Sequence, residues 1–140
     1  MIVHLNGWPA VGKLTVARVV AHKLGARLLD NHTLHDLAGR LCEWGTDEYW
    51  RLYYQFRNVA YGKIRTLPTR EVIVLTNALL SENDREVEAW NAVKNLARER
   101  SDQLVAVTLD CSLDENVRRL GSAERRHRKL VDPEPLIEWR

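Results

Sequence analysis

Four short apolar segments alternate with longer stretches in which apolar residues recur every three or four positions. Runs of four to eight residues rich in Val, Ile and Leu are typical of β-strands. Two of them, 71–77 and 104–111, are apolar almost throughout, which predicts strands covered on both faces of a sheet. The expected strands cover residues 2–6, 26–31, 71–77 and 104–111.

The stretches between these strands have helical periodicity. In the first, 13–24, the apolar residues at helical spacing are Val16, Val19, Val20 and Leu24. Gly25 is placed to end this helix. Residues 33–66 are helical in composition but broken near Gly45. The candidate N-terminal caps of later helices are Thr46, Asn83 and Ser112, the last two each followed three residues on by glutamate.

Strands that alternate with helices predict an α/β fold with a parallel sheet and right-handed crossovers. The 140 residues contain no internal repeat, low-complexity tract or Gly/Ser linker, so we expect a single domain over 1–140. With 45% hydrophobic and 29% charged residues, the composition is that of an ordinary globular protein. The net charge of +2 is too small to indicate a polyanionic partner by itself.

Compartment and membrane signals are few. Cys42 and Cys111 lie far apart without metal-ligand spacing, which predicts reduced, mostly buried thiols. The chain starts directly with a strand-like run and has no apolar stretch near 18 residues. We therefore expect a cytoplasmic protein with no membrane span.

The turn after the first strand carries the clearest chemical motif, Gly7-x4-Gly12-Lys13. Between a strand and a helix, such a loop points backbone N–H groups into one concavity beside the positive helix N-terminus, and lysine reaches the β- and γ-phosphates. The alternative is a plain strand–turn–helix corner. The expected nucleotide-binding residues are Gly7, Trp8, Pro9, Ala10, Val11, Gly12, Lys13, Leu14 and Thr15.

Asp30 ends the second strand, at the sheet edge where ligands of open parallel sheets bind. It is the candidate base for a phosphoryl acceptor, although it and Asn31 could instead cap the next helix. His32 is a candidate for the acceptor pocket. Arg57, in the aromatic-rich stretch 44–61, is a candidate partner for an acidic group on the acceptor. The aromatic residues around it are more typical of a core than of a pocket.

Basic residues gather between 118 and 129. Arg125 and Arg128 are the candidates for a lid that closes over the phosphates and stabilises the transferring group. The alternatives are a solvated helical face paired with Glu115 and Glu124, or a nucleic-acid patch. No aromatic residue is interleaved with the arginines, which disfavours nucleic acid.

Three segments, "GWPAVGKLTVAR", "LLDNHTL" and "RRLGSAERRHRKLVDP", resemble small P-loop kinase-like ATP-binding proteins. These are relatives of shikimate kinase, gluconate kinase and chloramphenicol phosphotransferase, often described as AAA-type ATPases. The resemblance implies a three-layer P-loop NTPase fold with sheet order 2-3-1-4-5, ATP with Mg²⁺ as cofactor, and phosphoryl transfer to a small molecule. It also implies that Asp30 orients or deprotonates the acceptor hydroxyl.

The sequence departs from this group at three places. Leu14 replaces the Ser or Thr that binds magnesium. Thr15 therefore becomes the candidate residue for contacting a phosphate oxygen and for binding the metal. The third strand ends in Thr76-Asn77, without the metal-orienting aspartate. Because the chain stops at Arg140, we expect the order 2-3-1-4 without a fifth strand, a possible C-terminal truncation, and an open edge that favours association.

Three functions follow as hypotheses. The first is an ATP-dependent kinase acting on a hydroxyl of a small molecule. The second is a nucleotide-binding module with little or no catalysis, to which Leu14 and the missing strand-end carboxylate point. The third and weakest is a P-loop protein that processes nucleic acid through the arginine stretch.

Overall fold

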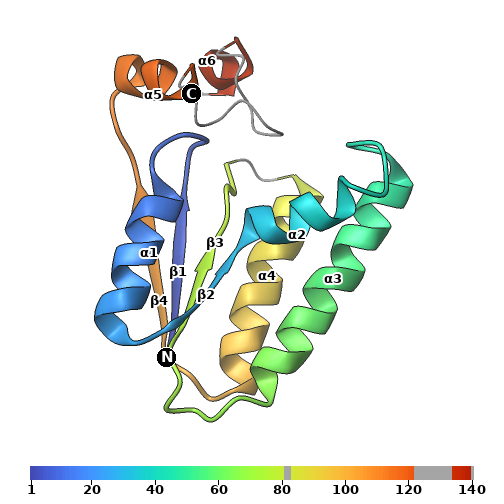
Figure 1. The fold of residues 1–140 in the computed structure, drawn as a ribbon, viewed down its shortest axis with the longest axis vertical. Coiled ribbons are helices and arrows are strands. Elements are labelled where there is room, and N and C mark those ends of the chain that lie inside the picture. Colours follow the sequence, from blue (N-terminus) through green and yellow to red (C-terminus); the bar gives the residue numbers. More distant parts are fainter. Residues whose placement is uncertain (81–82, 122–133, 140) are drawn as a thin grey trace.

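Four parallel strands form the centre of the structure, a computed structural model that describes residues 1–80, 83–121 and 134–139 (Figure 1). They are β1 (Ile2–Gly7), β2 (Arg27–Asp30), β3 (Ile73–Thr76) and β4 (Leu104–Leu109). Their order across the sheet is β2-β3-β1-β4, and every pairing is parallel. The α/β class and the order 2-3-1-4 are confirmed, and no fifth strand occurs in the described part of the chain.

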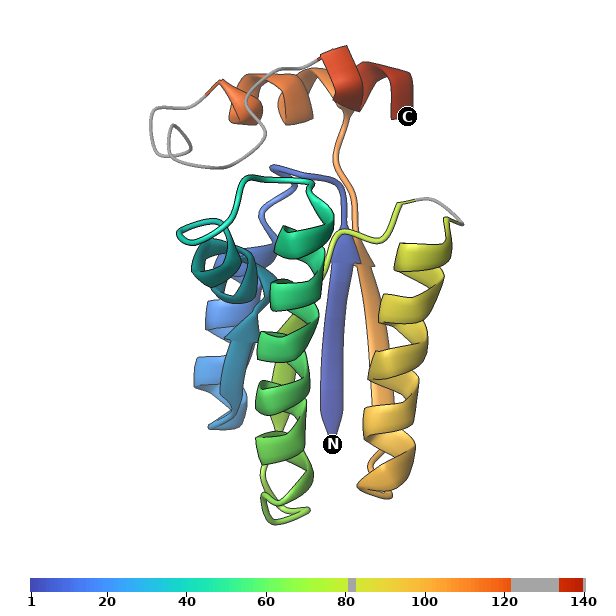
Figure 2. The ribbon, with the colours of Figure 1, turned by 90° about the vertical axis from the view of Figure 1, so that its right-hand side faces the viewer.

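Helices cover both faces of the sheet and its upper edge (Figures 1 and 2). On one face lies α1 (Lys13–Leu24), and on the other lie α3 (Asp47–Arg65) and α4 (Asp84–Glu99). The short α2 (Asn31–Ala38) connects β2 to α3. Above the carboxyl ends of the strands lie α5 (Leu113–Leu120) and α6 (Glu134–Trp139).

The helix boundaries follow local signals in the sequence. The side chains of Thr46, Asn83 and Ser112 each accept a hydrogen bond from the backbone N–H three residues later, at 3.2, 3.0 and 3.3 Å. Each thereby satisfies one of the free N–H groups that begin a helix. Gly25 ends α1 in the left-handed conformation, with φ of 58°. The predicted caps are confirmed.

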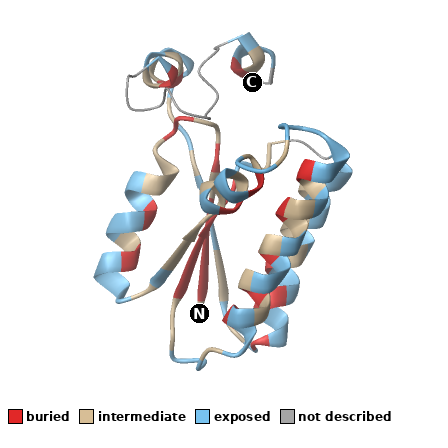
Figure 3. Cartoon of the chain, turned by 45° about the vertical axis from the view of Figure 1, so that its right-hand side comes forward, coloured by how far each residue is buried: buried red, intermediate tan, exposed pale blue. Residues whose placement is uncertain are grey.

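Alternation along β1 divides the core between the two faces of the sheet. Figure 3 shows buried residues both in the central strands and on the helices beside them. Ile2 points toward α3 and α4, where it joins Ile73 and Leu75. Val3 and Leu5 point the other way, toward α1. Because every residue of β3 is buried, the expectation that this strand is covered on both faces is confirmed.

The most buried residues of α1 are not the valines that its sequence presents, although Val20 is half-buried against the same core cluster. Val16 and Val19 are 37% and 52% exposed, whereas Ala17 and Ala21 are buried against the sheet. Residues four positions apart lie on one face of a helix, so both rows fit the same periodicity. The alanine row is the one that faces β1 and β3, and small side chains allow α1 to lie close to these strands.

The prediction that β4 is buried on both faces is wrong. Its residues are half-buried or exposed, with Val107 36% exposed. The reason is its position at the lateral edge of the sheet, where β1 is its one partner among the strands that the structure describes. Cys42 and Cys111 form no disulfide, but both are half-buried rather than buried. Within the described ranges, no helix is long and apolar enough to cross a bilayer.

Candidate functional site

The turn between β1 and α1 wraps its backbone around the ammonium group of Lys13. Lys13 Nζ donates to the carbonyl oxygens of Gly7 and Trp8, at 2.6 and 2.8 Å. Gly7 and Gly12 adopt φ values of 144° and 101°, which glycine tolerates best. Lys13 is also the first residue of α1, so a cation and a helix N-terminus share one concavity. This arrangement is suited to binding an anion.

The outer side of this loop packs against α5 and α6. Ala10, at φ of 66°, is buried together with Leu120 and Leu136. Asn116 of α5 is fully buried, and its amide Nδ2 donates to the carbonyl oxygen of Pro9 at 2.6 Å. The loop is therefore held in shape from outside by α5, a helix that begins at Leu113 and so is far from the loop in the sequence. The sequence analysis did not identify Asn116.

A second residue of α5, Arg119, lies against the same loop. Its Nη1 donates to the carbonyl oxygen of Val11 at 2.9 Å, and a Cβ atom on Gly12 would lie 3.6 Å from this nitrogen. Glu115 accepts hydrogen bonds from Arg118 and Arg119, and these bonds lower the pKa of its carboxyl group to about 2. The structure thus places one cation of the arginine stretch beside the N-terminus of α1.

The two arginines predicted to act as a lid, Arg125 and Arg128, lie outside the described residues. The other predicted residues of the first helical turn are in the described part. Leu14 is half-buried and Thr15 is exposed. Thr15 is the one side chain of this pair with an oxygen that could contact a phosphate or a metal.

Asp30 is the last residue of β2, so it lies at the carboxyl ends of the strands, as the loop after β1 does. In the register of the strands, Asp30 is paired with Thr76 of β3, and Thr76 is paired with Leu5 of β1. Two strand spacings separate Asp30 from β1, which is about 10 Å. A phosphate at the loop and a small molecule at Asp30 would therefore be neighbours.

The carboxylate of Asp30 does not cap the helix that follows it. Asp30 occupies the N-cap position of α2, but its side chain makes no capping hydrogen bond. Instead, Asp30 Oδ1 accepts a hydrogen bond of 2.5 Å from Thr76 Oγ1. The alternative prediction, that the Asp30 side chain caps α2, therefore does not agree with its hydrogen bonds.

Behind Asp30, the first turn of α2 is fixed to α3 by a chain of hydrogen bonds. Asn31 Oδ1 accepts from the Tyr53 hydroxyl at 2.7 Å, and Asn31 Nδ2 donates to His35 Nε2 at 3.1 Å. His35 Nδ1 then donates to the Tyr49 hydroxyl at 2.5 Å. Burial, with a smaller contribution from nearby His32, lowers the pKa of His35 to about 4, so His35 is neutral at pH 7. His32 itself is half-buried, with its ring centroid 6.4 Å from that of His35.

The aromatic-rich stretch is mainly core. Tyr49, Tyr53 and Tyr61 are buried, and Trp44 is 65% exposed. Arg57 is buried among them and forms a two-pronged pair with Glu88 of α4, at 2.7 and 2.5 Å. It lies ten residues, about 15 Å, along α3 from the start of that helix, and one turn after Tyr53. Its guanidinium group is engaged by Glu88 rather than by Asp30.

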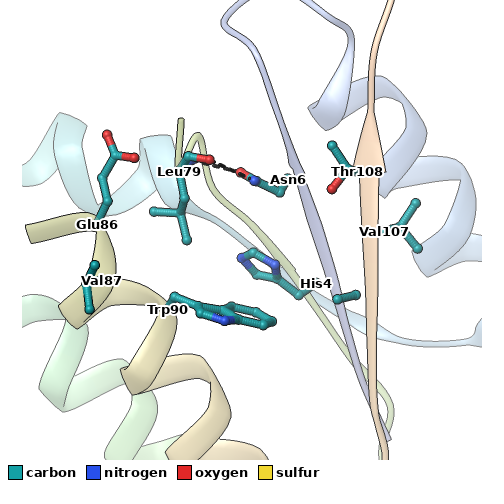
Figure 4. Close-up of a pocket in the computed structure, with 9 residues that line it drawn as sticks. His4, Asn6, Leu79, Glu86, Val87, Trp90, Val107 and Thr108 are labelled. Carbon is teal, nitrogen blue, oxygen red and sulfur yellow. Dashed lines mark hydrogen bonds between the residues drawn. The ribbon is translucent and has the colours of Figure 1, made fainter. Parts of the chain in front are cut away.

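A separate hollow of about 560 Å³ lies between α4 and the β1–β4 edge (Figure 4). Trp90 and Thr108 are among the residues that line it, and neither Lys13 nor Asp30 is. At its upper side Asn6 exchanges two hydrogen bonds with the backbone of Leu79, at 2.9 and 2.8 Å. These bonds fasten the segment after β3 to β1 and so help to shape the edge that carries the loop.

Among the described residues, no group of three or more His, Cys, Asp or Glu side chains is placed to hold a metal ion. The oxygen-bearing side chains at this edge include Thr15, Asp30 and Thr76. Magnesium keeps most of its water and binds through one or two carboxylates together with substrate phosphates. The donor set therefore fits a magnesium ion that arrives with a nucleotide better than one held by the protein alone.

No protein-family model and no curated protein matches the chain. Several solved structures do match the chain. Shikimate kinase from Acinetobacter baumannii, in complex with shikimate, is 16% identical with a TM-score of 0.61, over 99% of this chain and 73% of that one. A gluconokinase from Sinorhizobium meliloti 1021 is 15% identical with a TM-score of 0.57, over 98% and 71%.

A third structure, a kinase candidate from Chloroflexus aurantiacus, is 20% identical with a TM-score of 0.66, over 95% of this chain and 72% of that one. At such identities the likeness shows the fold alone. The chain therefore has the fold of P-loop kinases, as the sequence resemblance implies.

Proposed function

We propose that this chain is an ATP-dependent phosphotransferase that moves the γ-phosphoryl group of ATP to a hydroxyl group of a small molecule. The observation that carries the proposal is the enclosure of Lys13 Nζ by the loop carbonyls of Gly7 and Trp8, at the sheet edge that also carries Asp30. The kinase fold supports it, and two of the structural neighbours are named as kinases of shikimate and gluconate.

The nucleotide would bind with its phosphates over the loop. The backbone N–H groups between Gly7 and Gly12, the first turn of α1 and the ammonium group of Lys13 supply positive charge there. Gly12 leaves room, because a Cβ atom at this position would approach no atom closer than 3.6 Å. Arg119 adds a second cation next to Gly12.

Magnesium, when bound with ATP, would neutralise phosphate charge and orient the γ-phosphoryl group. Leu14 offers it no oxygen, so Thr15 is the proposed protein contact, with water completing the shell. Arg125 and Arg128 are retained in the proposal as the cations that close over the phosphates.

On the acceptor side, Asp30 would accept the proton of the attacking hydroxyl. The acceptor oxygen bonds to the γ-phosphorus, the bond from this phosphorus to the β–γ bridging oxygen breaks, and ADP leaves. His32, half-buried on the first turn of α2, would contact the acceptor. Arg57 is omitted from this pocket, because Glu88 engages its guanidinium group.

A second candidate function is a nucleotide-binding module with little turnover. It is favoured by Leu14 and by the end of β3, where Thr76 and Asn77 stand instead of a carboxylate. Both of these side chains are already engaged, Thr76 with Asp30 and Asn77 with His4.

A transfer assay separates the two candidates. ATP is supplied with a panel of hydroxylated acids and sugars, and ADP and phosphorylated product are measured together. The kinase proposal predicts product equal to ADP, and a loss of about 10²–10⁴ in turnover for Asp30→Asn with ATP binding retained. Asp36→Asn, an exposed carboxylate on α2, is the matched control and should change nothing. ATP binding without turnover on any acceptor would favour the second candidate, and restored turnover in Leu14→Ser would locate the defect.

A further inference from the structure

Thr76 connects the three parts that meet behind the proposed acceptor site. It is the last residue of β3, is 3% exposed and is paired in register with Asp30 of β2. Its hydroxyl donates to Asp30 Oδ1 at 2.5 Å and accepts from the backbone N–H of Asn31, the first residue of α2, at 3.1 Å. One hydroxyl thus joins β3, the end of β2 and the start of α2.

These two bonds fix the direction in which the Asp30 carboxylate can act. A threonine hydroxyl has one proton, and Thr76 gives it to Oδ1. Thr76 also accepts the backbone N–H of Asn31, one of the N–H groups at the start of α2 that have no partner inside the helix. Within residues 1–80, 83–121 and 134–139, no hydrogen bond is made to Asp30 Oδ2. One carboxylate oxygen is therefore anchored and the other is left for a ligand.

We infer that Thr76 is a positioning residue for phosphoryl transfer, which holds Asp30 so that Oδ2 accepts the proton of the acceptor hydroxyl. The inference rests on the proposed function and adds to it a residue that touches neither ATP nor acceptor. Thr76 ends β3, the strand that has no aspartate at its end to orient a metal ion. Its hydroxyl group orients Asp30 instead of binding a metal ion.

The geometry also explains why the anchor is a threonine in a buried strand end. The β-branched side chain has restricted χ1 freedom, which holds the hydroxyl in one direction. Asn31 is in turn bonded to Tyr53, so the peptide N–H that Thr76 accepts belongs to a fixed helix start. A base held within a few tenths of an ångström loses less activity to misalignment than a mobile one.

The test compares Thr76→Val, which keeps the shape and removes the hydroxyl, with Thr76→Ser, which keeps the hydroxyl. ADP release from ATP is measured with water as the phosphoryl acceptor, in wild-type and Asp30→Asn backgrounds. We expect Thr76→Val to lower kcat about tenfold or more with KM for ATP unchanged, and Thr76→Ser to stay within about threefold of wild type. In the Asp30→Asn background, Thr76→Val should cause no further loss, because it acts through the carboxylate.

A purely structural role predicts something else. In that case Thr76→Val would lower the melting temperature, and would lower kcat by the same factor in the wild-type and Asp30→Asn backgrounds. This result would overturn the inference. Equal kcat for Thr76→Val and wild type would overturn it as well. The proposed function fails separately, if the wild-type chain does not bind ATP in a thermal-shift measurement.

Discussion

Asn116 provides the sharpest test of how the phosphate loop is supported. It is fully buried in α5, and its amide donates to the carbonyl oxygen of Pro9 at 2.6 Å. Asn116→Ala removes the donor and leaves that half-buried carbonyl without it. Asn116→Asp keeps the size of the side chain, but an ionised carboxylate cannot donate and repels the carbonyl oxygen.

The magnitude follows from the lost hydrogen bond. A fully buried carbonyl left without its partner costs about 1–3 kcal/mol of folding free energy, so the half-buried carbonyl of Pro9 should cost about 1 kcal/mol or more. Because the loop would then have to be ordered by the nucleotide, part of this cost should appear in binding. A share of about 1.4 kcal/mol corresponds to a tenfold rise in the Kd for ATP.

The assay is urea unfolding of each variant, followed by titration with ATP. Asn95→Ala and Asn95→Asp are the controls, because Asn95 is exposed on α4 and should change the unfolding free energy by about 0.5 kcal/mol or less. If Asn116→Ala is no more destabilising than Asn95→Ala, the proposed support of the loop by α5 is refuted.

Three further predictions concern other contacts. Gly7→Ala should lose about 3 kcal/mol or more of stability, because its Cβ would lie 2.3 Å from a backbone oxygen of β4; Gly12→Ala should lose only the left-handed strain, about 1–2 kcal/mol. Glu88→Gln should cost about 1–3 kcal/mol in urea unfolding, because it removes the charged partner of the buried guanidinium group of Arg57. His35 has a pKa of about 4 in the fold against 6.5 ordinarily, so stability should fall by about 3 kcal/mol as pH drops from 6.5 to 4, and His35→Gln should flatten this dependence in acid unfolding curves.

Each of these has a counterpart that should behave differently. Equal losses for the two glycine variants would contradict the close approach of Gly7 to β4. Glu99→Gln, which breaks an exposed pair with Arg65, should cost less than about 1 kcal/mol. His22→Gln, on the exposed side of α1, should keep the full pH dependence. A wild-type protein equally stable at pH 6.5 and 4 would contradict the lowered pKa of His35.

The parts of the fold that depend on local chemistry could be predicted from the sequence. Thr46, Asn83 and Ser112 begin helices because a side-chain oxygen can reach an N–H three residues away without help from the rest of the fold. Lys13 and Asp30 could be assigned to one edge because parallel strands bring their carboxyl ends together.

Features set by distant neighbours could not be predicted in this way. The apolar pattern of β4 is that of a buried strand, and only the sheet order places it at the edge. The valine and alanine rows of α1 have the same periodicity, and the position of the sheet decides between them. Asn116 and Thr76 reach partners 107 and 46 residues away, so no local pattern marks them.

The central claim, that the loop around Lys13 is a phosphate site, is tested most directly by the Kd for ATP. The measurement compares wild type, Lys13→Ala and Lys23→Ala by calorimetric titration. Lys23 is exposed in the last turn of α1, so its loss changes the net charge equally but leaves the loop intact. We predict at least a tenfold higher Kd for Lys13→Ala than for wild type, about 1.4 kcal/mol or more, and no change for Lys23→Ala. Equal affinity of wild type and Lys13→Ala for ATP would contradict the claim.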